Sequence, residues 1–78
     1  MQLPSKIIPY EESVLSLFPP ILRRLEIAAI SVNGLYQSVK KEIDNVEDFL
    51  LALDCLYALG KIDYHEGERM LFYVGDAG

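Results

Sequence analysis

The chain has 78 residues, a net charge of −5, an apolar fraction of 51% and a mean hydropathy of +0.19. Its length allows one domain with a small core, and its acidic balance lacks the basic excess typical of nucleic-acid-binding proteins. Because so small a core hides little apolar surface, the high apolar content predicts a surface that binds a partner.

Cysteine content and the first residues narrow the class of protein further. Cys55 is the only cysteine, which rules out an internal disulfide or a thiolate cluster and favours a reducing compartment. The start, MQLPSKIIPY, lacks the basic and apolar segments of a signal peptide. No apolar run reaches the roughly 18–20 residues of a membrane span. We therefore expect a cytoplasmic protein.

Two prolines govern the first ten residues. Pro4 and Pro9 favour extended backbone and disfavour helix in the residues before them. The sequence thus predicts an extended N-terminal arm, residues 1–10, whose SKII segment serves as an edge strand or a docking arm. Residues 11–78 are then expected to form the single domain.

The next segment has a helical composition that a pair of prolines interrupts. The ring of Pro20 would clash with the carbonyl four residues earlier, so one straight helix is excluded. The pattern predicts a turn or short helix over residues 11–17, followed by a helix that begins at Pro19 or Pro20. The buried stripe of this helix is expected to comprise Ile21, Leu22 and Leu25.

A second main helix is predicted to begin after Ser31. The Ser31 hydroxyl can accept a hydrogen bond from a free amide of the first turn. Apolar residues then recur with the spacing of one helix face, at Val32, Leu35, Tyr36 and Val39. Gly34 costs about 1 kcal/mol relative to alanine in a helix, and close helix packing would explain its presence.

A third helix is predicted over the stretch VEDFLLALDCLYALG, residues 46–60. Asp44 or Asn45 is placed to cap its start, and Gly60 to end it in a left-handed conformation. At 100° per residue, one side of the helix collects the largest apolar residues. This expected core stripe comprises Val46, Phe49, Leu50, Leu53, Leu56 and Tyr57.

The opposite side of this helix carries a second apolar strip among acids. Its residues are Glu47, Asp48, Leu51, Asp54, Cys55 and Ala58. Leu51, Cys55 and Ala58 follow the i, i+4, i+7 spacing of a binding face, and Asp54 lies at its margin. We predict that these four residues, with Ile7 and Ile8 of the arm, bind a protein partner. The alternative is that the arm, with Leu3, Ile7 and Ile8, folds back over this side.

The last segment, KIDYHEGERMLFYV, predicts a β-hairpin. Ile62 and Tyr64 alternate with polar residues, HEGE forms a turn in which Gly67 supplies a positive φ, and RMLFYV forms the second strand. The resulting order of helices and hairpin predicts an α+β fold of the winged helix-turn-helix type, with the third helix in the recognition position. Another small α+β domain with the same order is the alternative.

The third helix contradicts the usual task of such a fold. It has no Lys, Arg, Asn or Gln to reach base edges and would instead present carboxylates to phosphates. Catalysis is equally disfavoured, because the single histidine, His65, and Cys55 lie on different elements. His65 stands among acids in a turn that is more typical of a solvated surface than of a metal site. We therefore expect that the protein is not an enzyme and that it binds neither a cofactor nor a metal ion.

The stretch FLLALDCLYALGKI, preceded by SVNGLYQSV and LPSKIIPYEESVL, resembles the small middle components of bacterial ABC-three-component systems. The pattern FxLALDxLYALGxI is present at Phe49, Leu51, Ala52, Leu53, Asp54, Leu56, Tyr57, Ala58, Leu59, Gly60 and Ile62. The paired prolines, Pro19 and Pro20, depart from the smoother first helix of that family. The resemblance covers nearly the whole chain.

The resemblance implies a non-catalytic subunit. Such systems, to which the Lamassu-type antiphage systems are related, pair a coiled-coil ATPase of the SMC or Rad50 type with an effector, often a nuclease. The middle component is expected on the ATPase, or between the ATPase and the effector. Two other functions stay open on the sequence: a winged-helix transcription regulator and an antitoxin-like partner protein.

Overall fold

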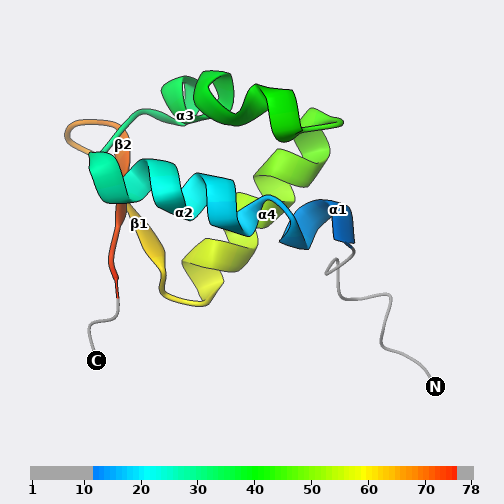
Figure 1. Ribbon diagram of the computed structural model, residues 1–78. Helices are drawn as coiled ribbons and strands as arrows, with labels where there is room; N and C mark the ends of the chain where they lie inside the picture. Colours follow the sequence, from blue (N-terminus) through cyan, green and yellow to red (C-terminus); the bar gives the residue numbers. More distant parts are fainter. Residues whose placement is uncertain (1–11, 76–78) are drawn as a thin grey trace.

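The computed structural model describes residues 12–75, so the expected arm, residues 1–10, lies outside the described residues. Its elements, in chain order, are α1 (Glu12–Leu15), α2 (Phe18–Ile27), α3 (Val32–Val39), the 3-10 helix η2 (Lys40–Glu42), α4 (Val46–Ala58), β1 (Ile62–His65) and β2 (Met70–Tyr73). Three main helices followed by an antiparallel hairpin make a small winged-helix-like α+β domain (Figure 1). The predicted fold class is confirmed.

The prolines divide the first helical segment as the sequence predicts. A turn separates α1 from α2, and Pro19 and Pro20 lie in the first turn of α2, where a missing amide hydrogen removes no bond within the helix. Ile21 and Leu25 are buried, whereas Leu22 is only partly buried. The side chains of α2 that point inwards are therefore those that the periodicity selects.

The N-terminal cap of α3 is confirmed, and its glycine has a specific neighbour. The Ser31 hydroxyl accepts a hydrogen bond from the Gly34 amide at 3.0 Å. A Cβ at Gly34 would lie 2.8 Å from Cγ1 of Ile30, which is shorter than van der Waals contact allows. The close approach at Gly34 is thus to a side chain in the segment before the helix rather than to another helix.

Both ends of α4 are closed by local hydrogen bonds. Of the two candidate caps, Asn45 is the one used: its side-chain oxygen accepts from the Asp48 amide at 2.9 Å. At the other end Gly60 has a φ of 78°. The next amide, that of Lys61, donates to the Leu56 carbonyl at 2.9 Å, which is the bond expected when a left-handed glycine ends a helix.

Backbone from the segment between α2 and α3 pairs with the hairpin and ties it to the helices. β1 and β2 pair in an antiparallel register that sets Ile62 opposite Tyr73. Ile30, between α2 and α3, forms an isolated bridge with Leu71 on the other edge of β2. Two hydrogen bonds make this bridge, of 3.1 Å from the Ile30 amide and 2.8 Å from the Leu71 amide. The sequence analysis did not predict it.

The turn of the hairpin differs from the prediction. The residue with positive φ is Arg69, at 57°, and Gly67 is not in that region. The turn contains the four residues between β1 and β2, and a loop of this kind is built on a type I turn that needs a left-handed residue before the second strand. His65 belongs to the turn structure, since its Nδ1 accepts from the Glu68 amide at 3.2 Å.

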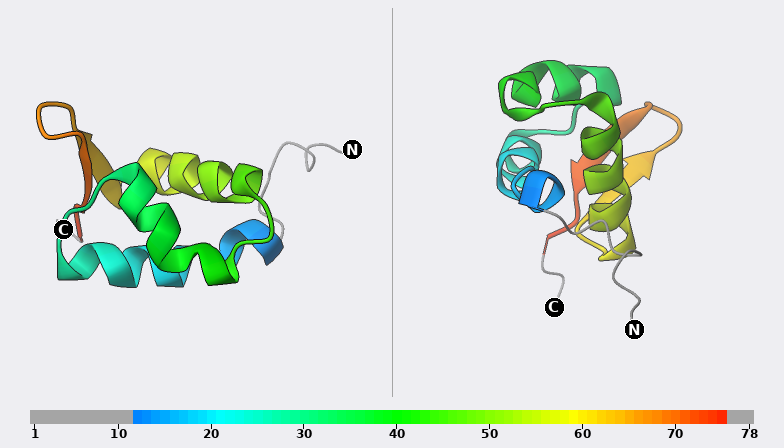
Figure 2. Two further views of the ribbon diagram at one scale, coloured as in Figure 1. Left: turned by 90° about the horizontal axis from the view of Figure 1, so that it is seen from above. Right: turned by 90° about the vertical axis from the view of Figure 1, so that its right-hand side faces the viewer.

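A single apolar core connects these elements. Its buried residues are Val14, Leu17, Ile21, Leu25, Leu35, Val39, Phe49, Ala52, Leu53, Leu56, Ile62 and Leu71. α2 packs against α3 and β2, while α4 packs against α1 and β1. In the two views of Figure 2, α1 lies beside α4 and the hairpin stands at the opposite end of the domain.

The buried side of α4 is not the one predicted. Phe49, Leu53 and Leu56 are buried as expected, but Ala52 and Cys55 are buried too. Three other residues of the expected core stripe, Val46, Leu50 and Tyr57, are 45%, 49% and 60% exposed. α4 therefore turns a different side towards the core than predicted. The difference is a rotation about the helix axis of less than roughly 100°, the angle between successive residues.

Candidate partner-binding surface

The structure places three of the predicted contact residues on one exposed side of α4. Leu51 is 37% exposed, and Asp54 and Ala58 are also exposed. Cys55, predicted to lie with them, is only 9% exposed and lines the interior, so that part of the prediction is wrong. Ile7 and Ile8 lie outside the described residues.

The short helix α1 packs against α4. Val14 of α1 and Leu17 of the following turn are among the most deeply buried side chains of the domain. Their i, i+3 spacing is typical of a helix face that needs a partner. The prediction gave this segment no packing role and placed Cys55 on the surface of α4, whereas Cys55 is buried.

The observed orientation of α4 also exposes apolar side chains that were predicted to lie in the core. Val46, Leu50 and Tyr57 lie on the solvent side of α4 next to Glu47, Leu51, Asp54 and Ala58. We call these seven residues the outer face of α4. Acidic side chains run along it between two apolar margins, one formed by Val46, Leu50 and Tyr57 and the other by Leu51 and Ala58.

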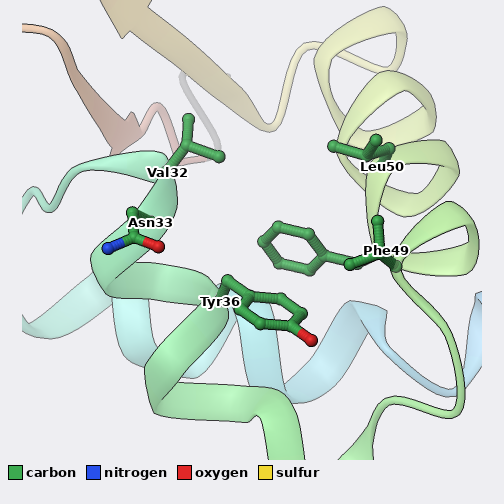
Figure 3. Close-up of a pocket in the computed structure, with 6 residues that line it drawn as sticks. Val32, Asn33, Tyr36, Phe49 and Leu50 are labelled. Atoms are coloured by element: carbon green, nitrogen blue, oxygen red, sulfur yellow. The ribbon is translucent and has the colours of Figure 1, made fainter.

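A hollow of about 470 Å³ lies between α3 and the first turns of α4 (Figure 3). The residues that line it are Val32, Asn33, Tyr36, Val46, Phe49 and Leu50. The rings of Tyr36 and Phe49 meet edge to face, with centroids 5.4 Å apart and planes at 67°. Figure 3 shows the Phe49 ring between the two helices, with Val32 and Leu50 on either side.

A second hollow, of about 320 Å³, adjoins the first on the outer face of α4. It is lined by Glu47, Leu50, Leu51 and Asp54. Leu50 lines both hollows, so its half-exposed side chain stands between an apolar groove and an acidic one. The arrangement offers recesses for apolar side chains next to two carboxylates, which is a pattern found on protein-recognition surfaces.

A scan against protein-family models gave the decisive comparison. The model of the ABC-three component (ABC-3C) system Middle Component 7 matches residues 3–71, which span α1 to the beginning of β2. The chain belongs to this family. Searches of curated proteins and of solved structures each found no significant match.

In the order of elements, α4 of this middle component stands where a DNA-binding winged helix has its recognition helix. Glu47, Asp48 and Asp54 are its charged side chains, and neither α3 nor α4 contains Lys or Arg. A phosphate backbone brought to this face would meet negative charge and exposed leucines. The surface therefore suits a protein better than a duplex.

Among residues 12–75, no group of three or more His, Cys, Asp or Glu side chains is placed to hold a metal ion. Over that range too, no helix has the length and apolar character needed to cross a membrane.

Proposed function

We propose that this middle component is a non-catalytic adaptor of its ABC-three-component system. It binds a coiled-coil ATPase of the SMC or Rad50 type and links that ATPase to an effector such as a nuclease, in a defence system related to the Lamassu type. Family membership supports the place in a multi-component system. The outer face of α4 supports docking to a protein.

The observation that carries the proposal is the amount of apolar side chain that α4 leaves in water. Leu50 and Leu51 are consecutive, are 49% and 37% exposed, and line adjoining hollows. Burying the exposed half of one leucine contributes about 1 kcal/mol, so both leucines with Val46 and Tyr57 offer several kcal/mol to an interface. We place the ATPase contact on this face, and the contribution of Ile7 and Ile8 stays a prediction.

Replacing Leu51 by Asp, alone or with Ala58→Asp, is expected to break the complex while the domain stays folded. Leu51 and Ala58 lie outside the core, so the free energy of unfolding should change little. In an interface the new carboxylate would lose water without gaining a partner, at a cost of about 2 kcal/mol or more, roughly a thirtyfold loss of affinity. Co-purification with the ATPase from cells that express the whole operon measures the effect.

The matched control for Leu51→Asp is Ile27→Asp, which puts the same carboxylate on an exposed apolar residue of α2, outside the outer face of α4, and should retain the ATPase. Circular dichroism of each variant reports whether the domain is folded. A folded Leu51→Asp variant that still co-purifies would move the contact to another surface. Unfolding of that variant would show that Leu51 is needed for the core, which would refute its assignment to a docking face.

A transcription regulator is the second candidate, because the winged-helix-like fold itself favours it. The middle component is nevertheless expected to bind duplex DNA only weakly, with a Kd above roughly 10 μM at physiological salt. Its net charge of −5 and the carboxylates of α4 give little counterion release. Titration of a labelled duplex at low and at physiological salt measures this. Submicromolar binding at physiological salt would favour the regulator over the adaptor.

A further inference from the structure

The two hollows beside Leu50 carry more information than a docking face alone. Leu50 contributes to the walls of both. The walls of the larger one come from α3 and α4, with apolar side chains and one amide, that of Asn33. The smaller one adds the carboxylates of Glu47 and Asp54. An occupant that covers both must therefore satisfy an apolar recess and, next to it, two negative charges.

We propose that this pair of hollows binds an amphipathic basic helix of a protein partner. One large apolar side chain of the helix enters the groove between α3 and α4, and two Lys or Arg side chains pair with Glu47 and Asp54, which lie about two helical turns apart on α4. A groove between two helices, with apolar side chains spaced along it, is the kind of site in which amphipathic helices are recognised. The proposal rests on the adaptor function, whose partner it describes.

Charge complementarity selects this occupant over the alternatives. No Lys or Arg lines either hollow, whose charged lining residues are Glu47 and Asp54. Lys40 and Lys41 of η2 lie between α3 and α4 in the chain but are not part of the lining. A second copy of the chain, related by a two-fold axis, would bring Glu47 and Asp54 against their own counterparts and be repelled. A basic partner replaces that repulsion by attraction, which raises the association rate and fixes the orientation of the helix.

Two synthetic peptides test the proposal on the full chain. Both are 16-residue amphipathic helices with the same Leu and Phe positions, and they differ only in having Lys or Glu at the flanking positions. Calorimetry should show the Lys peptide binding at least about tenfold more tightly than the Glu peptide at low salt. Amide NMR shifts on adding the Lys peptide should centre on Tyr36, Val46 and Leu50. Equal affinities, no binding, or shifts centred elsewhere would overturn the proposal.

Charge reversal supplies the matched control. Glu47→Lys with Asp54→Lys should invert the peptide preference, whereas Glu26→Lys with Glu66→Lys, on other exposed surfaces, should leave it unchanged. An equal loss in both pairs would show that net charge alone decides the preference and would overturn the site. Nuclear Overhauser contacts from the methyl groups of Ile7 or Ile8 to Val46 would assign the groove to the chain's own arm. That outcome would also overturn the proposal.

The ATPase of the same system separates this inference from the proposed function. If the wild-type chain fails to co-purify with the ATPase, the adaptor function itself is refuted. If the wild-type chain co-purifies and the Glu47→Lys, Asp54→Lys variant does so equally well, only the basic-helix site is refuted. Loss of the ATPase from that variant, with retention by the Glu26→Lys, Glu66→Lys control, supports both.

Discussion

Phe49→Ala is expected to lower the free energy of unfolding by about 3–5 kcal/mol, a large share of the stability of so small a domain. Phe49 is 2% exposed, joins the core from α4 and makes the edge-to-face contact with Tyr36 of α3. Removing its ring opens a cavity at the junction of the two helices. Because small domains have only about 5–15 kcal/mol of stability, urea titration followed by circular dichroism should show a large fall in the midpoint.

Leu50→Ala is the matched control for this variant, since it truncates the next residue along α4. Leu50 is 49% exposed, so its loss should cost less than about 1 kcal/mol. Equal midpoints for Phe49→Ala and the wild type would refute the assignment of Phe49 to the core. A midpoint for Leu50→Ala as low as that of Phe49→Ala would refute the exposed position of Leu50.

Exchanging two neighbours, Asp54→Cys with Cys55→Asp, is expected to destabilise the domain by about 3 kcal/mol or more. The double variant has the same composition and the same net charge as the wild type. Its carboxylate, however, moves from an exposed position to one that is 9% exposed, on the buried side of α4. Thermal melting at neutral pH, where a carboxylate is charged in water, measures the effect.

The single variant Asp54→Cys isolates the cause. It changes the exposed position alone and should melt within a few degrees of the wild type, because surface substitutions alter stability by about 0.5 kcal/mol or less. The predicted orientation of α4, with Cys55 outwards and Leu50 inwards, requires the reverse: a double variant about as stable as the wild type. The exchange thus decides between the two orientations of the helix by experiment.

The features that the sequence predicted well are those decided by neighbouring residues. The caps at Ser31 and Asn45 and the end of α4 at Gly60 depend on hydrogen bonds that span three to five residues. The break before α2 depends on the covalent geometry of its prolines. Such interactions are complete within one segment of chain, so periodicity and residue type are enough to place them.

The features that the sequence did not predict depend on contacts between distant segments. The inward side of α4 depends on the elements that pack against it, among them α1 and β1, and α4 is apolar on so many sides that its own periodicity favours no single orientation. Of the predicted contact residues, Leu51, Asp54 and Ala58 are exposed and Cys55 is buried, and partner binding at this face stays a prediction. The left-handed residue of the turn was predicted at Gly67 and lies at Arg69, because the length of the loop, rather than its glycine, decides the position.

The bridge between Ile30 and Leu71 has a topological consequence. Its two hydrogen bonds close a circuit of backbone that contains both α3 and α4, the helices on either side of the larger hollow. The pairing of β2 with Ile30 thus closes a long loop of backbone. Closing this loop lowers the entropy of the chain, and the packing of the helices within it offsets that cost. Truncating the chain before β2 would open the circuit and loosen the groove at a distance, although no residue of the hairpin lines it.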